Sequence, residues 1–400
     1  MKSLSHSREE SATTSIAGLR VAVVQPVLPT YRVPFFNLLA RNTGIKLSIL
    51  CDMHPTGSLK SAAPTDQFCA EHHPGRDIGA FCSHPAFLTA VSDPRFDIAI
   101  LGWNLRIMQL VPSLLRARAG GRPTLLWGHG FSRSERAITR TMRNSLVGLS
   151  NGVILYSNAA KQKLQSNGIA ASKIWVAQNA IDQSSVLAAT ASWTADPKRL
   201  AAWQRDHAIT DGELIVFISR VEPDKRVDLL LDAFQQLVGR RAKTKLVIIG
   251  GGSMLEQVRA DVATRGLAER VCITGPIYDE EQIAPWCLSA GCFAYPEAIG
   301  LSIYHGLGYG LPIITSDNIA SHNPEIESLQ PGVNGVLYRH RDMDSFAQAM
   351  DQVLSNPAER VKWRQRALDT VCRPGGFNLE TMVSGYADAL RACATSVRSG

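Results

Sequence analysis

The sequence has no long hydrophobic run and no ordered set of cysteines. No stretch of about 18 consecutive apolar residues occurs, so it holds no candidate for a membrane-spanning helix. Residues 1–18 are polar and lack the apolar centre of a signal peptide, which predicts a flexible tail on a cytoplasmic protein. The eight cysteines form no C-x-x-C pair, which argues against a zinc site and a disulfide framework and favours buried free thiols.

The composition is that of a soluble globular protein. A hydrophobic content of 45% and a charged content of 19% argue against a disordered or fibrous chain. A length of 400 residues suits two domains of ordinary size better than a single core.

Positive charge is concentrated in the first half of the chain. Residues 1–190 hold 20 Lys and Arg against 10 Asp and Glu, whereas residues 191–400 hold 22 against 25. The two halves are therefore expected to meet different partners. The basic half suits an anionic membrane surface, a phosphate-bearing substrate or nucleic acid.

Short apolar runs alternate with helical patterns along both halves. The runs are rich in Val, Ile and Leu, which is typical of strands buried on both faces of a parallel sheet. Predicted strands cover 20–25, 46–51, 97–102, 123–127, 152–156 and 173–177, then 214–219, 245–250, 270–274, 292–295, 312–315 and 335–338. Predicted helices include 105–118, 158–166, 226–238, 253–265, 279–288, 301–307, 344–354 and 379–395. This alternation predicts an α/β fold of two Rossmann-like doubly wound domains that face each other across a ligand-binding cleft.

Breaks in the alternation suggest the domain boundaries. After the tail 1–18, residues 19–190 are expected to form an N-terminal domain and residues 191–375 a C-terminal domain. An Ala- and Ser-rich stretch at about 183–212 is interpreted as the linker. The segment 376–400 follows Pro-Gly-Gly and is predicted to be a helix that crosses back to the N-terminal domain.

Two cations follow the strand predicted at 214–219. Arg220 and Lys225 stand five residues apart in a loop that faces the ligand, and a guanidinium beside an ammonium suits a diphosphate. The next strand ends at Gly250 and is followed by Gly251 and Gly252, where missing side chains permit either a ligand contact or a tight turn. No G-x-G-x-x-G is present, which weakens a dinucleotide site.

The most informative segment lies between the strands predicted at 292–295 and 312–315. The first strand delivers Glu297, and a helix then opens whose N–H groups at Gly300, Leu301 and Ser302 can bind phosphate. His305 follows in the same helix.

Together these motifs resemble family 4 of the retaining glycosyltransferases, whose fold is GT-B. The resemblance is carried by Arg220 with Lys225, the glycine turn, and the Glu297 segment closed by Gly-x-Pro. Residues 179–182 (Asn-Ala-Ile-Asp) resemble the family's Asn-Gly-Val-Asp, and Glu325 falls at the family's Pro-Glu. The resemblance runs over about 173–340 and is weaker before that.

The resemblance implies roles in a donor site. Arg220 and Lys225 would neutralise the donor diphosphate, Glu297 would bind hydroxyls of the donor sugar, and Ile277 stands where backbone groups meet the base. The family's second glutamate, which binds the ribose hydroxyls, is replaced by His305. An imidazole does not bind two hydroxyls as a carboxylate does, so either His305 contacts the ribose differently or ribose binding is weaker.

The first domain departs further from the family. The Gly-Gly after its first strand is absent, and Tyr31 and Arg32 stand there instead, within reach of the cleft. Arg32 either replaces a glycine-made anion site or caps local structure. His129, flanked by glycines after a strand, falls where the family often has a functional histidine, and it joins Glu297, Arg220 and Lys225 as the catalytic set. No nucleophile is assigned, because a front-face reaction needs mainly positioning and charge stabilisation.

A possible metal motif occurs at Asp342-Met343-Asp344. D-x-D binds metal in other glycosyltransferases, but here it precedes a predicted helix, so Asp344 is interpreted as its N-cap. We expect no metal and no other cofactor.

Arginines at 133, 136, 140 and 143 share one face of a predicted helix. Arg133, Arg136, Arg140 and Arg143 are spaced by 3, 4 and 3 residues. This face is either solvated or a contact with anionic headgroups or a lipid-diphosphate acceptor at the inner face of the cytoplasmic membrane. Nucleic acid is disfavoured because no aromatics interleave with the arginines.

Residues and resemblance together predict a metal-independent retaining hexosyltransferase. It would move a hexose from a nucleoside-diphosphate sugar to a glycan or lipid-linked acceptor, in bacterial surface or exopolysaccharide biosynthesis. The alternatives are a GT-B sugar-nucleotide epimerase or hydrolase and an inactive nucleotide-sugar-binding homologue. A nicotinamide oxidoreductase is least favoured, because the dinucleotide fingerprint is absent.

Overall fold

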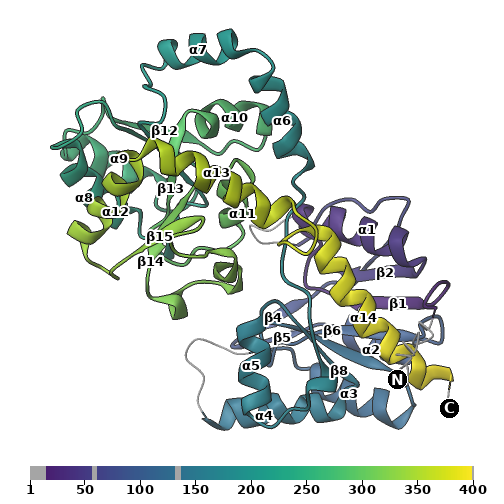
Figure 1. Ribbon diagram of the computed structural model, residues 1–400. Coiled ribbons are helices and arrows are strands. Elements are labelled where there is room, and N and C mark those ends of the chain that lie inside the picture. Colours follow the sequence, from purple (N-terminus) through teal and green to yellow (C-terminus); the bar gives the residue numbers. More distant parts are fainter. Residues whose placement is uncertain (1–14, 56–60, 131–136, 399–400) are drawn as a thin grey trace, which may run out of the picture.

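Two α/β domains make up the protein (Figure 1). The structure is a computed structural model that describes residues 15–55, 61–130 and 137–398. The sheet of the N-terminal domain is parallel throughout and has the order β3-β2-β1-β6-β7-β8-β9. Its strands are β1 (Arg20–Val24), β2 (Lys46–Cys51), β3 (Cys69–His72), β6 (Ile98–Gly102), β7 (Thr124–Gly128), β8 (Gly152–Leu155) and β9 (Ile174–Val176), and a hairpin of β4 (Arg76–Ile78) and β5 (Phe81–Ser83) lies apart from it.

Helices cover both faces of this sheet. On one face α1 (Val33–Thr43) and α14 (Leu379–Arg398) share a buried apolar cluster with the strands. On the other face lie α2 (Ala86–Ser92), α3 (Leu110–Ala119), α4 (Ala137–Leu149) and α5 (Asn158–Ser166). Because both faces are covered, the central strands are largely apolar, as their sequences predict, whereas the edge strand β3 is polar and partly exposed.

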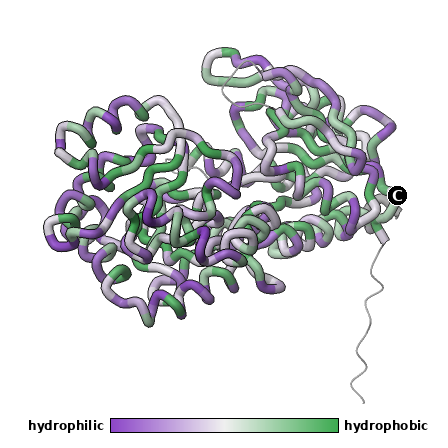
Figure 2. Tube along the Cα trace, turned by 90° about the horizontal axis from the view of Figure 1, so that it is seen from above, coloured by the Kyte–Doolittle hydropathy of each residue, from purple (hydrophilic) through white to green (hydrophobic). Residues whose placement is uncertain are grey.

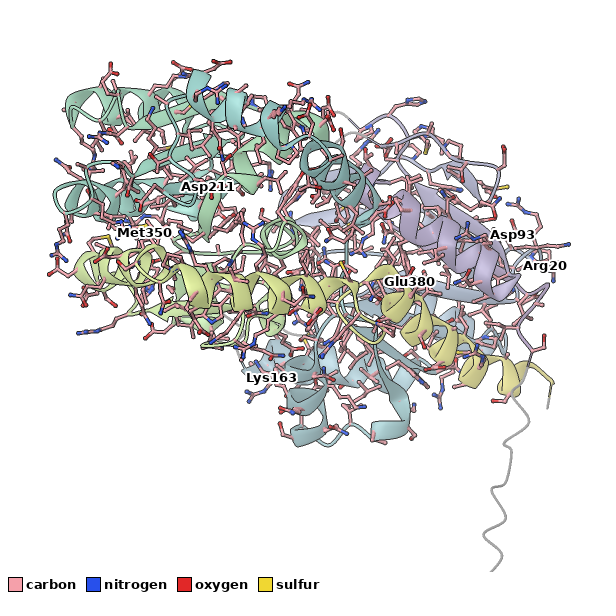
Figure 3. All side chains as sticks on the ribbon, turned by 45° about the horizontal axis from the view of Figure 1, so that its top comes forward. Arg20, Asp93, Lys163, Asp211, Met350 and Glu380 are labelled. Atoms are coloured by element: carbon pink, nitrogen blue, oxygen red, sulfur yellow. The ribbon has the colours of Figure 1, made fainter. Side chains whose placement is uncertain are left out.

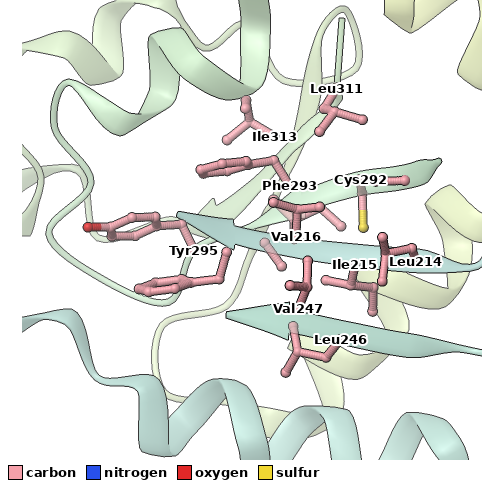
Figure 4. Close-up of a cluster of buried hydrophobic side chains, with 14 of the residues drawn as sticks. Leu214, Ile215, Val216, Leu246, Val247, Cys292, Phe293, Tyr295, Leu311 and Ile313 are labelled. Atoms are coloured by element: carbon pink, nitrogen blue, oxygen red, sulfur yellow. The ribbon is translucent and has the colours of Figure 1, made fainter. Parts of the chain in front are cut away.

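The C-terminal domain repeats the scheme with the parallel order β12-β11-β10-β13-β14-β15. Its strands are β10 (Leu214–Ile218), β11 (Lys245–Ile249), β12 (Val271–Gly275), β13 (Ala290–Ala294), β14 (Ile313–Ser316) and β15 (Gly335–Tyr338). Its helices are α6 (Ser184–Thr194), α7 (Pro197–Asp206), α8 (Val227–Val238), α9 (Leu255–Thr264), α10 (Glu280–Leu288), α11 (Ser302–Gly308), α12 (Met343–Leu354) and α13 (Pro357–Cys372). Figure 4 shows Val216, Val247 and Phe293 packed at the centre of its core.

In both sheets the strand order reverses at one point. In each sheet the first strands are added on one side of the initial strand and the later strands on its other side. The reversal lies between β1 and β6 in the first sheet and between β10 and β13 in the second. Loops that leave adjacent strands at such a reversal diverge to opposite faces and leave a crevice for a ligand. The predicted fold of two doubly wound domains is confirmed, and hydrophobic segments gather inside each domain (Figure 2).

The stretch at 183–212 is not a plain linker. It forms α6 and α7, and Val186, Ala189 and Trp193 of α6 belong to the C-terminal core. Helix α6 packs on α10 and so belongs to the C-terminal domain. The domain boundary expected at residue 190 therefore falls inside α6. The interpretation as a linker was wrong: Ala favours helices, but the stretch has few large apolar residues at helical spacing, so no buried helix face was evident from its sequence.

The two ends of the described chain both pack on the N-terminal domain. Ile16, expected in the tail, is buried in the cluster beneath α1 and α14. At the other end α14 packs against α1 and strands β7, β8 and β9. Figure 3 shows Glu380 at the start of α14, where the chain leaves the C-terminal domain.

Helix α3 is shorter than predicted. It begins at Leu110 instead of residue 105, because Pro112 lacks the N–H that a longer helix would need at that position. Among the helices of the described ranges, none combines the length and apolar character needed to cross a bilayer.

Candidate functional site

The loops after β10 and β13 meet at the strand reversal of the C-terminal sheet. Lys225 from the first loop donates from Nζ to the carbonyl oxygen of Ala298 in the second loop, at 3.1 Å. Arg226, Ala298 and Arg341 have φ values of 49°, 54° and 58°. Side chains are rarely found in this region, and such strain often accompanies ligand-binding loops.

A cavity of about 520 Å³ lies between the two domains; we call it the interdomain cavity. The N-terminal domain contributes Tyr31, Arg32, His129, Tyr156 and Asn179 to its lining. The C-terminal domain contributes Ser219, Arg220, Lys225, Tyr295, Gly300, Leu301, Ser302, Asn323 and Glu325. The structure thus brings the predicted cations, the start of α11 and the three first-domain candidates to one cavity.

A second cavity of about 600 Å³ lies within the C-terminal domain; we call it the C-domain cavity. Its lining includes Arg220, Gly250, Gly251, Gly252, Ile277, Glu280, Ser302 and His305. Arg220 and Ser302 line both cavities, so the two spaces adjoin.

The glycines after β11 are needed for a close backbone contact. Gly250 and Gly252 have φ values of 150° and 157°, and a Cβ atom at either would collide with the carbonyl oxygen of Ser219 or Val221. Val221 in turn donates its N–H to Gly251 at 2.9 Å. The glycine turn therefore holds the Arg220 loop in place and also forms part of the C-domain cavity wall.

Glu297 is buried, with 8% of its surface exposed. Its carboxylate lies 3.3 Å from His340 Nδ1 and 3.5 Å from Arg341 Nε, both in the segment after β15. Neighbouring Tyr295 and Gly300 line the interdomain cavity. Glu297 is thus held beside the cavity by basic groups that the sequence did not indicate.

His305 is paired with an acid. Its Nε2 lies 2.7 Å from Glu280 Oε1, and the Tyr309 hydroxyl donates to Glu280 Oε2 at 2.7 Å. Burial raises the pKa of Glu280, but hydrogen bonds and charge from His305, with the Tyr309 hydrogen bond, outweigh it and leave that pKa lowered. Glu280 was not predicted from the sequence. The only indication of it was that position 305 holds a histidine where the family has a glutamate.

Arg32 is buried in an aromatic setting, with 4% of its surface exposed. Its guanidinium lies 4.9 Å from the centroid of the Trp127 ring and donates to the Tyr156 hydroxyl at 3.3 Å. It makes no side-chain cap hydrogen bond at the start of α1, so the local-cap alternative is wrong. His129 is exposed, with its ring 4.9 Å from that of Tyr156.

Two glutamates join the C-terminal domain to the N-terminal domain. Asn179 donates to buried Glu325 at 2.5 Å. Glu327 accepts from the N–H groups of Asn158 and Ala159 at the start of α5. A further cavity of about 490 Å³, lined by His129, Ile319, Ile326 and Glu327 among others, adjoins this contact; we call it the apolar cavity.

Part of the predicted arginine face lies on α4. Arg140 and Arg143 are in this helix, whereas Arg133 and Arg136 lie outside the described residues. On the same helix Ile138 and Met142 are 76% and 59% exposed.

The cap of α12 is not the residue predicted. Asp342 caps the helix by accepting from the Ser345 N–H at 2.8 Å, and Asp344 lies inside the first turn. The helix starts one residue earlier than its sequence pattern indicates, so the assignment of Asp344 was wrong.

Solved structures identify the class of fold. A glycosyltransferase from Rickettsia africae superimposes with a TM-score of 0.70 at 15% identity, over 96% of this chain and 100% of that one. The Anabaena protein HepE in complex with UDP gives 0.68 at 16% identity, over 93% and 99%. The protein has the GT-B fold.

Sequence comparison agrees with the fold. Residues 201–370 match the model of the family Glycosyl transferases group 1, which confirms the resemblance drawn from the motifs. A D-inositol 3-phosphate glycosyltransferase of Frankia alni is 30% identical over 204 residues, 47% of this chain and 48% of that protein. A GDP-mannose-dependent phosphatidylinositol monomannoside mannosyltransferase of Mycolicibacterium smegmatis is 28% identical over 212 residues, 49% and 54%. The chain thus spans about half the length of these relatives.

Proposed function

We propose that the protein is a retaining glycosyltransferase that moves a hexose from a nucleoside-diphosphate sugar to a glycan or lipid-linked acceptor. The observation that carries the proposal is the joint position of Arg220, Lys225 and His129 around the interdomain cavity. Two cations stand at the strand reversal of one domain, and a histidine faces them from the other domain.

This arrangement suits cleavage of a bond to a diphosphate. As the glycosidic bond breaks, negative charge grows on the leaving phosphate, and Arg220 and Lys225 stabilise it in a site partly closed from water. Glu297, fixed by His340 and Arg341, would bind hydroxyls of the sugar. His129 would contact the sugar from the N-terminal domain. The leaving phosphate itself can take the acceptor's proton.

The names of the relatives support the substrate class. The relative from Mycolicibacterium smegmatis is named as a mannosyltransferase of phosphatidylinositol monomannoside, and a further relative, from Escherichia coli, as an O-antigen chain mannosyltransferase. The Anabaena structure holds UDP. These names support a nucleotide-linked hexose and a lipid-linked or glycan acceptor, as in surface-polysaccharide assembly.

A donor screen tests the proposal. UDP-, GDP- and ADP-sugars are compared for thermal stabilisation of the wild type, and we expect one class to raise Tm. Arg220→Ala should abolish the shift, whereas Arg240→Ala, an exposed arginine just beyond α8, should leave it unchanged. If no donor stabilises the wild type, or if Arg220→Ala keeps the full shift, the assignment of this site fails.

Product analysis separates the proposal from its alternatives. An epimerase or hydrolase converts the donor without an acceptor, and an inactive homologue binds the donor without turnover. A transferase should turn over substantially only when acceptor is added, with the α-anomeric configuration of an α-linked donor retained in the product.

We also propose that α3 and α4 contact an anionic membrane at the cytoplasmic face. Met108, Val111 and Leu115, in and just before α3, are 51%, 42% and 52% exposed, and Ile138 and Met142 of α4 are also exposed. Arg116, Arg118, Arg140 and Arg143 lie on the same two packed helices. Apolar side chains that enter the headgroup region and cations that pair with phosphate are typical of interfacial helices.

Vesicle co-sedimentation tests the membrane contact. Binding to phosphatidylglycerol vesicles should exceed binding to phosphatidylcholine vesicles and should fall in Ile138→Ser with Met142→Ser. Val361→Ser, which changes a 70% exposed residue of α13, is the control. Equal binding to both lipids would contradict the proposal.

A further inference from the structure

The C-domain cavity contains a carboxylate next to the position where the family's second glutamate is missing. Glu280 is the first residue of α10, whereas His305 lies in α11. The two helices bring the Glu280 carboxylate and His305 Nε2 within 2.7 Å. The acid absent from α11 is thus supplied, at nearly the same place, by another helix.

The pair is positioned where a nucleotide's ribose must pass. Arg220, proposed for the diphosphate, and Ile277, which the resemblance places at the base, line the same cavity as Glu280 and His305. A nucleoside diphosphate that contacts both Arg220 and Ile277 has its ribose between them. Its hydroxyls are hydrogen-bond donors that need acceptors in the wall.

Glu280 has acceptor capacity left for these hydroxyls. A carboxylate offers about four acceptor positions, and His305 and Tyr309 occupy one on each oxygen. The Tyr309 side chain is buried and holds the carboxylate from the protein side. The side chains of Glu280 and His305 are 14% and 28% exposed, so both remain accessible from the cavity.

Whatever its charge, His305 is used as a donor here. Nε2 faces a carboxylate oxygen at hydrogen-bond distance, so this nitrogen carries the proton. A histidine that donates to a carboxylate in this way keeps the carboxylate ionised and holds it in one orientation. A mobile glutamate on the surface would not be held in one orientation.

We propose that Glu280, oriented by His305 and Tyr309, is the carboxylate that binds the 2′- and 3′-hydroxyls of the donor ribose. Glu280 is the binding residue, and His305 and Tyr309 are positioning residues. The inference rests on the proposed function, because it presupposes a nucleoside-diphosphate donor. It differs from the expectation that His305 itself contacts the ribose.

Ribose selectivity is the direct test. Binding of UDP, GDP and ADP and of their 2′-deoxy and 3′-deoxy forms is measured by calorimetry. The nucleotide that binds the wild type should bind about tenfold to a hundredfold more tightly than its deoxy forms, since hydrogen bonds to a charged acceptor are lost. In Glu280→Gln this preference should shrink to about threefold or less, because a neutral amide offers a weaker acceptor.

A neighbouring acid provides the matched control. Glu281 follows Glu280 in α10, but its carboxylate pairs with Arg199 at 3.0 Å. Glu281→Gln should keep the full ribose preference. Tyr309→Phe removes one hydrogen bond to the Glu280 carboxylate without adding a charge, and it should lower the preference by an intermediate factor.

A transfer of the acid from α10 to α11 tests the geometry independently. His305→Glu alone puts two carboxylates side by side and should weaken nucleotide binding. Adding Glu280→Gln relieves the repulsion and returns an acid to α11, so the double variant should regain a preference for ribose over deoxyribose.

The outcomes separate this inference from the proposed function. If the wild type binds none of the three nucleotides, the donor site and the ribose assignment both fail. If the wild type binds one but Glu280→Gln, folded as judged by its circular dichroism spectrum, keeps the wild-type ribose preference, only the ribose assignment fails.

Discussion

Lys225 and Ala298 join two loops that are 73 residues apart in sequence: the Lys225 ammonium donates to the Ala298 carbonyl oxygen at 3.1 Å. The same ammonium pairs with Asp224 at 2.9 Å, and the Lys225 side chain is only 12% exposed. Lys225 thus supplies a fixed positive charge and also shapes the backbone that leads from Glu297 to α11.

Replacing Lys225 should weaken donor binding. In Lys225→Met both the charge and the contact with Ala298 are lost, and we expect the Kd for the nucleoside diphosphate to rise about tenfold to a hundredfold. Lys225→Arg should give an intermediate value, because the charge remains but a planar fork replaces a compact ammonium. Calorimetry gives the Kd values. Lys243→Met, at an exposed site before β11, serves as control, and a Kd in Lys225→Met equal to that of the control would contradict the prediction.

Replacing Glu297 should slow transfer more than it weakens nucleotide binding. Glu297→Gln keeps the shape but removes the charge that His340 and Arg341 hold beside the cavity. We expect kcat to fall on the order of a hundredfold, the size typical of losing one positioned polar group, with the Kd of the free nucleoside diphosphate unchanged. Steady-state kinetics and calorimetry check the two parts separately. Equal losses in kcat and in affinity for the nucleoside diphosphate would show that Glu297 acts on folding of the loop instead.

The burial of Glu325 should make stability depend on pH. Burial raises the pKa of Glu325 above 4.5, and the Asn179 hydrogen bond and the charge of Arg32 reduce this rise. The folded state therefore binds the proton more tightly than the unfolded state. The stability that this group contributes is complete below about pH 4.5 and is lost as the pH rises through the folded pKa.

Glu325→Gln removes this titration and can still accept from Asn179. Relative to the wild type, the variant should gain in free energy of unfolding as pH rises from 4 to 8, by about 1.4 kcal/mol for each unit of pKa shift. Urea unfolding across this range measures the difference. Glu256→Gln, at an 88% exposed side chain, should show no such trend, and a pH-independent difference for Glu325→Gln would rule the prediction out.

Removal of divalent metal should leave the rate of transfer unchanged. Arg220 and Lys225 carry the charge that a metal would otherwise supply to the diphosphate, and Asp342 already serves as a helix cap. Initial rates are compared with and without excess EDTA. A loss of activity that Mg²⁺ or Mn²⁺ restores would contradict metal independence.

The central strands of both sheets were predictable because they are buried on both faces, whereas the more exposed strands β3, β4 and β5 were not predicted. Residues 246–249 have to be apolar, whatever their neighbours are, and β11 covers Lys245–Ile249 where the sequence predicts 245–250. Of the helices, α6 and α7 were missed, although α8, α9, α10 and α12 were predicted to within two residues at each end. Trp193 of α6 and Trp203 of α7 pack around α10. The local sequence does not distinguish a linker from a helix whose apolar side chains are buried by a distant element.

The sequence by itself determined the alternation of strands and helices, the two domains and the loops that carry Arg220, Lys225 and Glu297. These features depend on local periodicity and on residues that follow buried strands. Only the tertiary structure decided which groups surround them: Lys225 on Ala298, Glu297 between His340 and Arg341, and Glu280 beside His305. The two members of each pair come from different parts of the fold. The sequence around one member therefore does not indicate which charged group a distant element places beside it.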